Sequence, residues 1–154
     1  MTTVSIIIVS YNARAFLLAC LRSLYAESTR AELEVIVVDN GSTDGSVEAL
    51  RADYPQVQRI ENDGNVGFAR ANNQGIAAAQ GEVLALVNSD IELRPGAIDA
   101  LLDVLAREPA AGLLGPRVLN RDGSLQPSCT REPTYLSVFA ENVFLHRLLP
   151  GLGA

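Results

Sequence analysis

The chain of 154 residues contains no lysine and no tryptophan, one histidine and two cysteines. The missing lysine excludes mechanisms that need an amine side chain, including the lysine-containing phosphate loop of P-loop proteins. Two cysteines form no disulfide framework and have no metal-ligand spacing, so we expect reduced thiols. His146 stands in a tail rich in Leu, Phe and Arg without a G-x-S-x-G motif upstream, which predicts a surface or interface histidine.

Positive charge and long apolar runs are also scarce. The 12 arginines face 18 acidic residues, and the net charge of -6 argues against nucleic acid as a partner. No uninterrupted apolar run approaches the roughly 18 residues of a membrane span, and no secretory signal pattern opens the sequence. We therefore expect a cytoplasmic protein, with at most peripheral contact at the inner face of the membrane.

The sequence does contain a repeated alternation of strand-like and helix-like segments. Short apolar runs with strand character occur at 4–9, 33–38, 57–60 and 83–87, and helical patterns follow at 13–26, 47–54, 67–79 and 95–107. Four such units predict an α/β fold with a mainly parallel sheet and helices on both faces.

Three further expectations concern single elements. The first helix carries apolar residues at helical spacing, namely Phe16, Leu17, Cys20, Leu21 and Leu24. A fifth strand is expected over residues 113–119. A hairpin turn is expected after it, with Asp122 and Gly123 at the tip.

Polar side chains follow three of the predicted strands, at the point where each strand ends. They are Ser10, Tyr11 and Asn12 after the first strand, Asp39 to Ser42 after the second, and Asn88, Ser89 and Asp90 after the fourth. Because the carboxyl ends of parallel strands meet at one edge, we expect the three clusters to lie together where α/β sheets bind ligands. Each cluster taken alone is also typical of turns and helix caps. The glycine pattern of dinucleotide-binding folds is absent, since "SYNARA" contains no glycine.

Five segments carry a resemblance to a known family. In chain order they are "SIIIVSYNARAFLLACLRSL", "EVIVVDNGSTDGS", "NDGNVGFARANNQGI", "LALVNSDIEL" and "GLLGPRVLNRDGSLQPS". Together they resemble the family 2 glycosyltransferases of the GT-A fold, and most closely the rhamnosyltransferase-like members. The resemblance implies that residues 1–128 are the nucleotide-sugar-binding half of a GT-A domain and that residues 129–154 are a helical tail opening the acceptor half.

The resemblance also implies a reaction. A sugar, rhamnose by branch, would pass with inversion from a UDP- or dTDP-type donor to a glycan or lipid-linked acceptor, with Mg²⁺ or Mn²⁺. The general base is expected beyond residue 154, because Glu132 and Glu141 lack the family's context and the chain has about half a member's length. The implied donor-binding residues are Ser10, Tyr11, Asn12, Asp39, Asp44, Asn65, Gly67, Phe68, Arg70, Asn88, Ser89 and Asp90.

Individual roles follow from the same match. Tyr11 is expected to pack on the base, Asp39 to hydrogen-bond the base or ribose, and Arg70 to reach the diphosphate, although a solvated helix arginine is the plain alternative. The family's D-x-D element falls on "NSD", so Asp90 is the expected metal ligand while Asn88 brings no charge. Hard oxygen ligands with few protein contacts suit Mg²⁺ and Mn²⁺.

Other interpretations stay open. A non-catalytic α/β nucleotide-binding module also fits the strand ends, and a nucleotidyltransferase would want a glycine-rich first loop with basic residues, where this chain offers only Arg14. The apolar residues within 135–149 predict an amphipathic helix that serves self-association or membrane contact, or that packs on the protein's own core.

Overall fold

The fold is known from a computed structural model that describes residues 2–27 and 29–127. The predicted helical tail lies outside the described residues, together with Glu132, Glu141, His146 and the second cysteine, Cys129. The chain divides into two units, one up to Gly112 and one from Leu113 onward.

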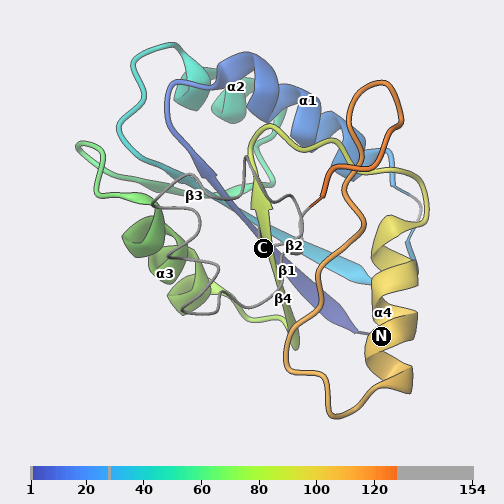
Figure 1. The fold of residues 1–154 in the computed structure, drawn as a ribbon. Helices are drawn as coiled ribbons and strands as arrows, with labels where there is room; N and C mark the ends of the chain where they lie inside the picture. Colours follow the sequence, from blue (N-terminus) through green and yellow to red (C-terminus); the bar gives the residue numbers. More distant parts are fainter. Residues whose placement is uncertain (1, 28, 128–154) are drawn as a thin grey trace, which may run out of the picture. The chain divides into compact units, whose positions relative to one another are not determined.

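Strands and helices alternate in the first unit as the sequence predicts (Figure 1). The elements are β1 (Thr3–Ser10), α1 (Arg14–Tyr25), β2 (Glu32–Asp39), α2 (Ser46–Asp53), β3 (Gln58–Glu61), α3 (Phe68–Ala78), β4 (Val83–Asn88) and α4 (Ala97–Arg107). The strands pair in the order β3-β2-β1-β4, and every pairing is parallel. The predicted parallel α/β sheet is therefore confirmed.

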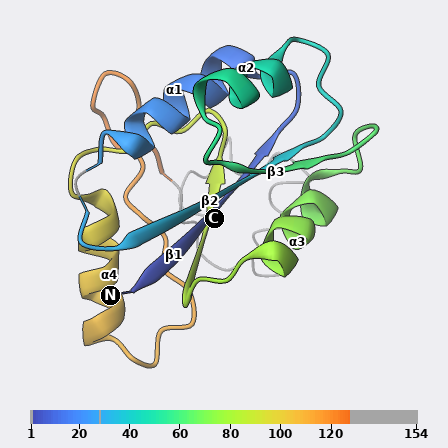
Figure 2. The same ribbon diagram turned by 180° about the vertical axis from the view of Figure 1, so that it is seen from behind.

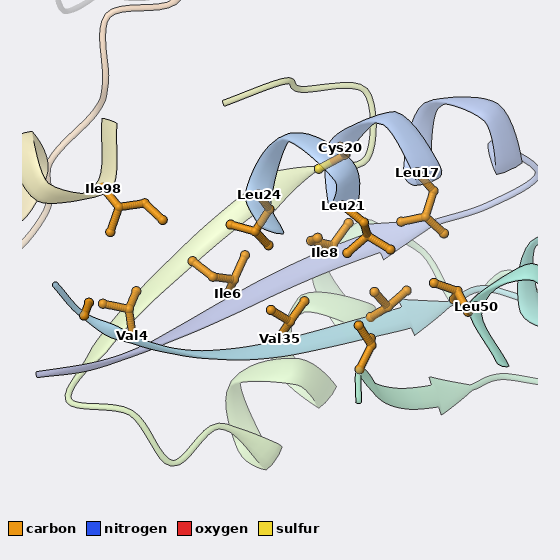
Figure 3. Close-up of a cluster of buried hydrophobic side chains, with 13 residues drawn as sticks. Val4, Ile6, Ile8, Leu17, Cys20, Leu21, Leu24, Val35, Leu50 and Ile98 are labelled. Atoms are coloured by element: carbon orange, nitrogen blue, oxygen red, sulfur yellow. The ribbon is translucent and has the colours of Figure 1, made fainter. Parts of the chain in front are cut away.

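Different helices cover the two faces of this sheet, as the opposed views in Figures 1 and 2 show. On one face, Ile6 and Ile8 of β1 pack in a buried apolar cluster with side chains of α1, α2 and α4. Figure 3 shows the buried side chains of α1, Leu17, Cys20, Leu21 and Leu24, lying over β1 and β2. On the other face, Ile36 and Val38 of β2 pack with Ala71 of α3. Successive side chains of β2 point to opposite faces of the sheet, so this strand contributes to the core on both faces.

Helix α3 lies close to the sheet because small residues form its inner side. A Cβ atom at Gly75 would lie 2.4 Å from Cγ2 of Ile7 and 3.4 Å from Cγ2 of Val38. Ala71, one turn earlier, is fully buried. This close contact fixes the start of α3, at Phe68, beside the carboxyl ends of the strands.

Cys20 is a free thiol in the α1 core. Its burial, followed by the negative charges of Asp90 and Glu92, raises the pKa of the Cys20 thiol to about 11. The thiol is therefore protonated, and unreactive, at neutral pH.

None of the helices within the described ranges is long and apolar enough to cross a membrane.

The second unit contains a turn but not the expected strand. The prediction of a strand over residues 113–119 is wrong, because only a single antiparallel bridge, between Leu119 and Leu125, is present there. Pro116 interrupts the segment and has no N–H group to donate to a ladder. The hairpin turn itself is confirmed: the Gly123 N–H donates to the Asn120 carbonyl at 2.9 Å, and Gly123 has a φ of +84°.

Candidate functional site

Parallel pairing brings three polar strand ends to one edge of the sheet. Ser10 lies beside Asp39 in the register of β1 and β2, and Val9 lies beside Asn88 in the register of β1 and β4. The expectation that these clusters share an edge is therefore confirmed. It is the edge at which open α/β sheets bind their ligands.

A cleft with a volume of about 440 Å³ opens at this edge. Its lining residues are Val9, Tyr11, Ala13, Phe16, Asn40, Asn65, Phe68, Asn88, Ser89 and Asp90. Six of the residues predicted to bind a donor are among them: Tyr11, Asn65, Phe68, Asn88, Ser89 and Asp90. The other six, Ser10, Asn12, Asp39, Asp44, Gly67 and Arg70, lie outside its wall.

Three aromatic side chains stand at the cleft with a large part of their surface open. Tyr11 is 50% exposed, Phe16 is 51% exposed and Phe68 is 60% exposed. Phe16 keeps its predicted place in the first helix, in the first turn of α1, but its side chain lines the cleft and is not part of the buried cluster that holds Leu17. Flat aromatic faces at a ligand cleft are suited to stacking against a planar ring.

Hydrogen bonds join the loop after β1 to the loop after β2. The Asn12 N–H donates to the Ser42 hydroxyl at 2.9 Å, and the Thr43 N–H donates to Oδ1 of Asn12 at 2.8 Å. Asn12 has a φ of +49°, a left-handed conformation that asparagine tolerates better than most residues. Asn12 thus braces the two loops rather than lining the cleft.

Asp44 forms a second brace between the same loops. Its Oδ2 accepts from the Arg14 N–H at 2.8 Å, while its Oδ1 accepts from the Ser46 N–H at 3.1 Å and from the Ser46 hydroxyl at 2.5 Å. Desolvation opposes ionisation of this carboxyl, but the hydrogen bonds from Ser46 and Arg14 outweigh it and lower the pKa of Asp44. Its oxygens are thereby already engaged at the starts of α1 and α2.

We expect Asp44→Ala to lower the free energy of unfolding by about 1 kcal/mol, because the amides at two helix starts lose their acceptor. The lowered pKa sets the pH dependence: the stabilisation is present above the ordinary carboxyl pKa of the unfolded chain and is lost as the pH falls through the folded value. Urea unfolding at pH 7 and at pH 3 measures both effects. A difference between variant and wild type that does not shrink at low pH would contradict this role. Asp53→Ala, at the exposed end of α2, is the control.

Asp39 and Ser10 are buried behind the cleft. Asp39 is 3% exposed, and its Oδ2 accepts from the amides of Gly41 and Ser42 at 3.1 and 2.8 Å. Its Oδ1 and the Ser10 hydroxyl oxygen are buried with no hydrogen-bond partner among the described residues. Buried polar atoms are rarely left unpaired, so these two point to a group that binds at this edge.

The segment before α3 forms part of the cleft wall through Asn65. Oδ1 of Asn65 accepts from the Gly67 N–H at 2.9 Å, and this turn leads into α3. Gly67 has φ +87° and ψ +157°, a region that only glycine occupies readily. Arg70, one turn further, is exposed and does not line the cleft.

Asn88, Ser89 and Asp90 turn away from the sheet at the end of β4. The Ile91 N–H donates to the Asn88 carbonyl at 3.2 Å, and the Asp90 side chain is exposed at the cleft. Within the described ranges, no three His, Cys, Asp or Glu side chains gather into a metal-binding group. A single exposed carboxylate fits only a cation that takes most of its ligands from water and phosphate, as Mg²⁺ does.

Four of the lining residues were not predicted to bind a donor: Val9, Ala13, Phe16 and Asn40. Val9 and Ala13 are apolar residues that carry no signal of a site. Asn40 directly follows Asp39 at the end of β2, and this position was the signal that could have found it.

The family model described as "Glycosyl transferase family 2" matches residues 5–146. The chain belongs to glycosyltransferase family 2. This confirms the resemblance seen in the five sequence segments. The matched residues include every residue that lines the cleft, from Val9 to Asp90.

Curated relatives match much of this chain. An N-acetylglucosaminyl-diphospho-decaprenol L-rhamnosyltransferase of Mycobacterium tuberculosis is 35% identical over 143 residues, which are 85% of this chain and 46% of the relative. The uncharacterized glycosyltransferase YibD of Escherichia coli is 38% identical over 101 residues, which are 64% of this chain and 29% of the relative. The chain thus spans about half the length, or less, of these relatives.

Solved structures of other proteins share the fold. The mannosyltransferase PcManGT of Pyrobaculum calidifontis, in complex with GDP-Man and Mn²⁺, superposes with a TM-score of 0.61 at 28% identity, over 67% of this chain and 32% of that one. TarS 1-349 of S. aureus, in complex with UDP-GlcNAc, gives 0.63 at 22% identity, over 70% and 32%. These neighbours confirm the predicted GT-A fold.

Proposed function

We propose that this chain is the donor-binding part of a glycosyltransferase that holds a nucleoside-diphosphate sugar in the cleft at the carboxyl edge of the sheet. The observation that carries the proposal is the composition of the cleft wall: exposed aromatic rings stand on one surface together with the Asn88, Ser89 and Asp90 turn. A sugar nucleotide needs both a flat apolar surface for its base and oxygen-based groups near its diphosphate.

The base and ribose are assigned to the side of the cleft that holds Tyr11. Its half-exposed ring offers a stacking face. Behind it, the unpaired Oδ1 of Asp39 is an acceptor for an N–H or O–H group of the nucleoside. An unpaired buried carboxylate oxygen is costly, so its pairing by a ligand would contribute to binding.

The diphosphate is assigned to the side that holds Asp90. Mg²⁺ or Mn²⁺ bound there would neutralise the charge that develops on the departing diphosphate. Asp90 would supply one protein ligand, and Asn88 would orient a ribose hydroxyl or a bound water. Arg70 of α3 is exposed, and its side chain has the length to approach the phosphates.

The M. tuberculosis relative is an L-rhamnosyltransferase, and its name places the acceptor sugar on a lipid diphosphate. We therefore favour rhamnose as the transferred sugar, a UDP or dTDP donor, and a glycan or lipid-linked acceptor. Inversion requires a general base for the acceptor hydroxyl. Asp90 is the one carboxylate that lines the cleft within the described part, so we assign the base to another part of the protein. A position at the inner face of the membrane and self-association through residues 129–154 stay predictions.

Isothermal titration calorimetry of the 154-residue chain with UDP, dTDP and GDP, each with and without Mn²⁺ or Mg²⁺, tests the proposal. We expect at least one of these diphosphates to bind, and the cation to tighten binding by about tenfold or more. UMP is the control, because it lacks the second phosphate and should gain much less from the cation. If a folded sample binds none of the three diphosphates, the proposal is wrong.

A further inference from the structure

Asn40 lines the cleft but has no role in the donor site described so far. The residue is only 2% exposed, and its position is fixed by the sheet because its N–H donates to the Ser10 carbonyl at 2.8 Å. The two ends of its side-chain amide differ. Oδ1 accepts a hydrogen bond from Nδ2 of Asn62 at 3.1 Å, whereas Nδ2 has no partner among the described residues.

A pair of amides holds Asn40 in this orientation. Nδ2 of Asn62 donates to Oε1 of Gln74 at 2.9 Å, and Nε2 of Gln74 donates back to Oδ1 of Asn62 at 2.8 Å. Asn62 is also anchored through its backbone N–H, which donates to the Asp39 carbonyl at 2.9 Å. Both hydrogens of the Asn62 amide nitrogen are therefore used, one for Gln74 and one for Asn40.

Helix α3 holds the hydrogen-bonded amides of Gln74, Asn62 and Asn40 in place. Gln74 precedes Gly75, the residue that packs against Ile7 of β1 without space for a side chain. Gln74 is consequently held in place by the close packing of the next residue against the sheet. The amide of Asn40 is thus oriented before any ligand arrives, and its free group at the cleft is an N–H donor.

We propose that Asn40 is a specificity-determining residue whose Nδ2 donates a hydrogen bond to the exocyclic carbonyl oxygen at C4 of a pyrimidine base or at C6 of a purine base, with Asn62 and Gln74 as positioning residues. This inference rests on the proposed function. The cleft supplies the matching stacking surfaces, since Tyr11 and Phe68 line it with Asn40. Uracil and thymine carry this oxygen at C4 and guanine carries it at C6, whereas cytosine and adenine carry an amino group at those positions. The C2 carbonyl oxygen of cytosine is shared with uracil and does not distinguish the two bases.

An unfavourable contact between the Asn40 amide nitrogen and the amino group of a base explains why the site would discriminate between bases. An amino group placed against the Asn40 Nδ2 would bring two donors together, and a buried polar group would lose its partner. Selection then depends on the difference between two affinities and does not require tight binding of either base. The ratio of the dissociation constants of CDP and UDP is the quantity that reports it.

The test uses calorimetry with UDP and CDP on the wild-type chain and on two variants. We expect the wild type to bind UDP about tenfold or more tightly than CDP. Asn40→Asp replaces the donor by an acceptor of the same shape and should lower the CDP-to-UDP ratio of Kd values by about tenfold. Asn62→Asp should act in the same direction, because its carboxylate attracts Nδ2 of Asn40 and turns Oδ1 toward the cleft.

Asn73→Asp is the matched control: it makes the same chemical change on the exposed side of α3 and should leave the ratio unchanged. General damage to the cleft would weaken both nucleotides alike and would not move the ratio. An unaltered ratio in Asn40→Asp and Asn62→Asp, with UDP still bound by the wild type, overturns the inference alone. An equal shift in Asn73→Asp also overturns it. Absence of binding of UDP, dTDP and GDP alike by the folded wild type refutes the proposed function itself.

Discussion

The Asp90→Ala variant is expected to bind UDP with the same affinity in the presence and in the absence of Mn²⁺. In the wild type we expect the cation to improve the affinity by about tenfold or more, equivalent to about 1.4 kcal/mol. The variant loses this gain because Asp90 is the carboxylate of the cleft wall within the described residues. Calorimetry with and without the cation, on variant and wild type, measures the loss.

The metal-free titration gives the second half of this result. Without a cation, the Asp90 carboxylate faces the negative diphosphate and repels it. Its removal should therefore leave the metal-free affinity unchanged or slightly improved, whereas a collapsed cleft would weaken it. Glu92→Ala is the matched control, since it removes the same charge two residues further on, at an exposed position outside the cleft wall. If Asp90→Ala keeps its metal dependence, the cation is held elsewhere.

Gly41→Ala is expected to lower the free energy of unfolding by about 3 kcal/mol or more, the largest stability effect we predict for a single methyl group. Gly41 has a φ of +79°, which is strained for alanine. Its new Cβ would also lie 2.6 Å from Cα and 2.9 Å from the nitrogen of Gly64. Both atoms are backbone, so no rotamer change relieves the clash. The loops after β2 and β3 would have to move apart.

Gly45→Ala separates the two causes of the expected loss of stability, namely backbone strain and the clash with Gly64. Gly45 lies in the same loop and has nearly the same φ, +82°, but a Cβ there would meet Nη1 of Arg14 at an ordinary 3.5 Å. We therefore expect a loss of only about 1 kcal/mol, from backbone strain alone. Urea unfolding of both variants gives the comparison. Equal losses would show that the Gly41–Gly64 contact contributes nothing.

The sheet and the edge that carries the cleft were predictable from the sequence because both follow from local pattern. Runs such as "SIIIVS" and "EVIVVD" are apolar on successive residues, which is typical of strands buried on both faces. Once four strand and helix units are read in order, the rule for parallel sheets places Ser10, Asp39 and Asn88 at one edge. The register of β1 with its two neighbours bears this out.

Features that depend on where an element stops were not predictable in the same way. Phe16 continues the apolar spacing of α1, but it stands in the first turn of the helix, where its side chain is half exposed at the cleft while that of Leu17 is buried. The pattern over residues 113–119 is apolar enough for a strand, but strand pairing needs a partner and Pro116 lacks a donor. The hydrogen bonds that connect Asn40 to Gln74 through Asn62 join residues 34 positions apart, and neither segment alone contains a sequence pattern that predicts them.

The braces between the loops after β1 and β2 have a consequence for the kinetics of binding. Asn12 and Asp44 tie these loops together through hydrogen bonds that exist in the ligand-free fold. The conformational entropy of these loops is therefore lost when the chain folds, and this loss is not repeated when a ligand binds. A ligand should associate at a rate that is set by diffusion and orientation, with affinity differences between nucleotides residing in how fast each one leaves.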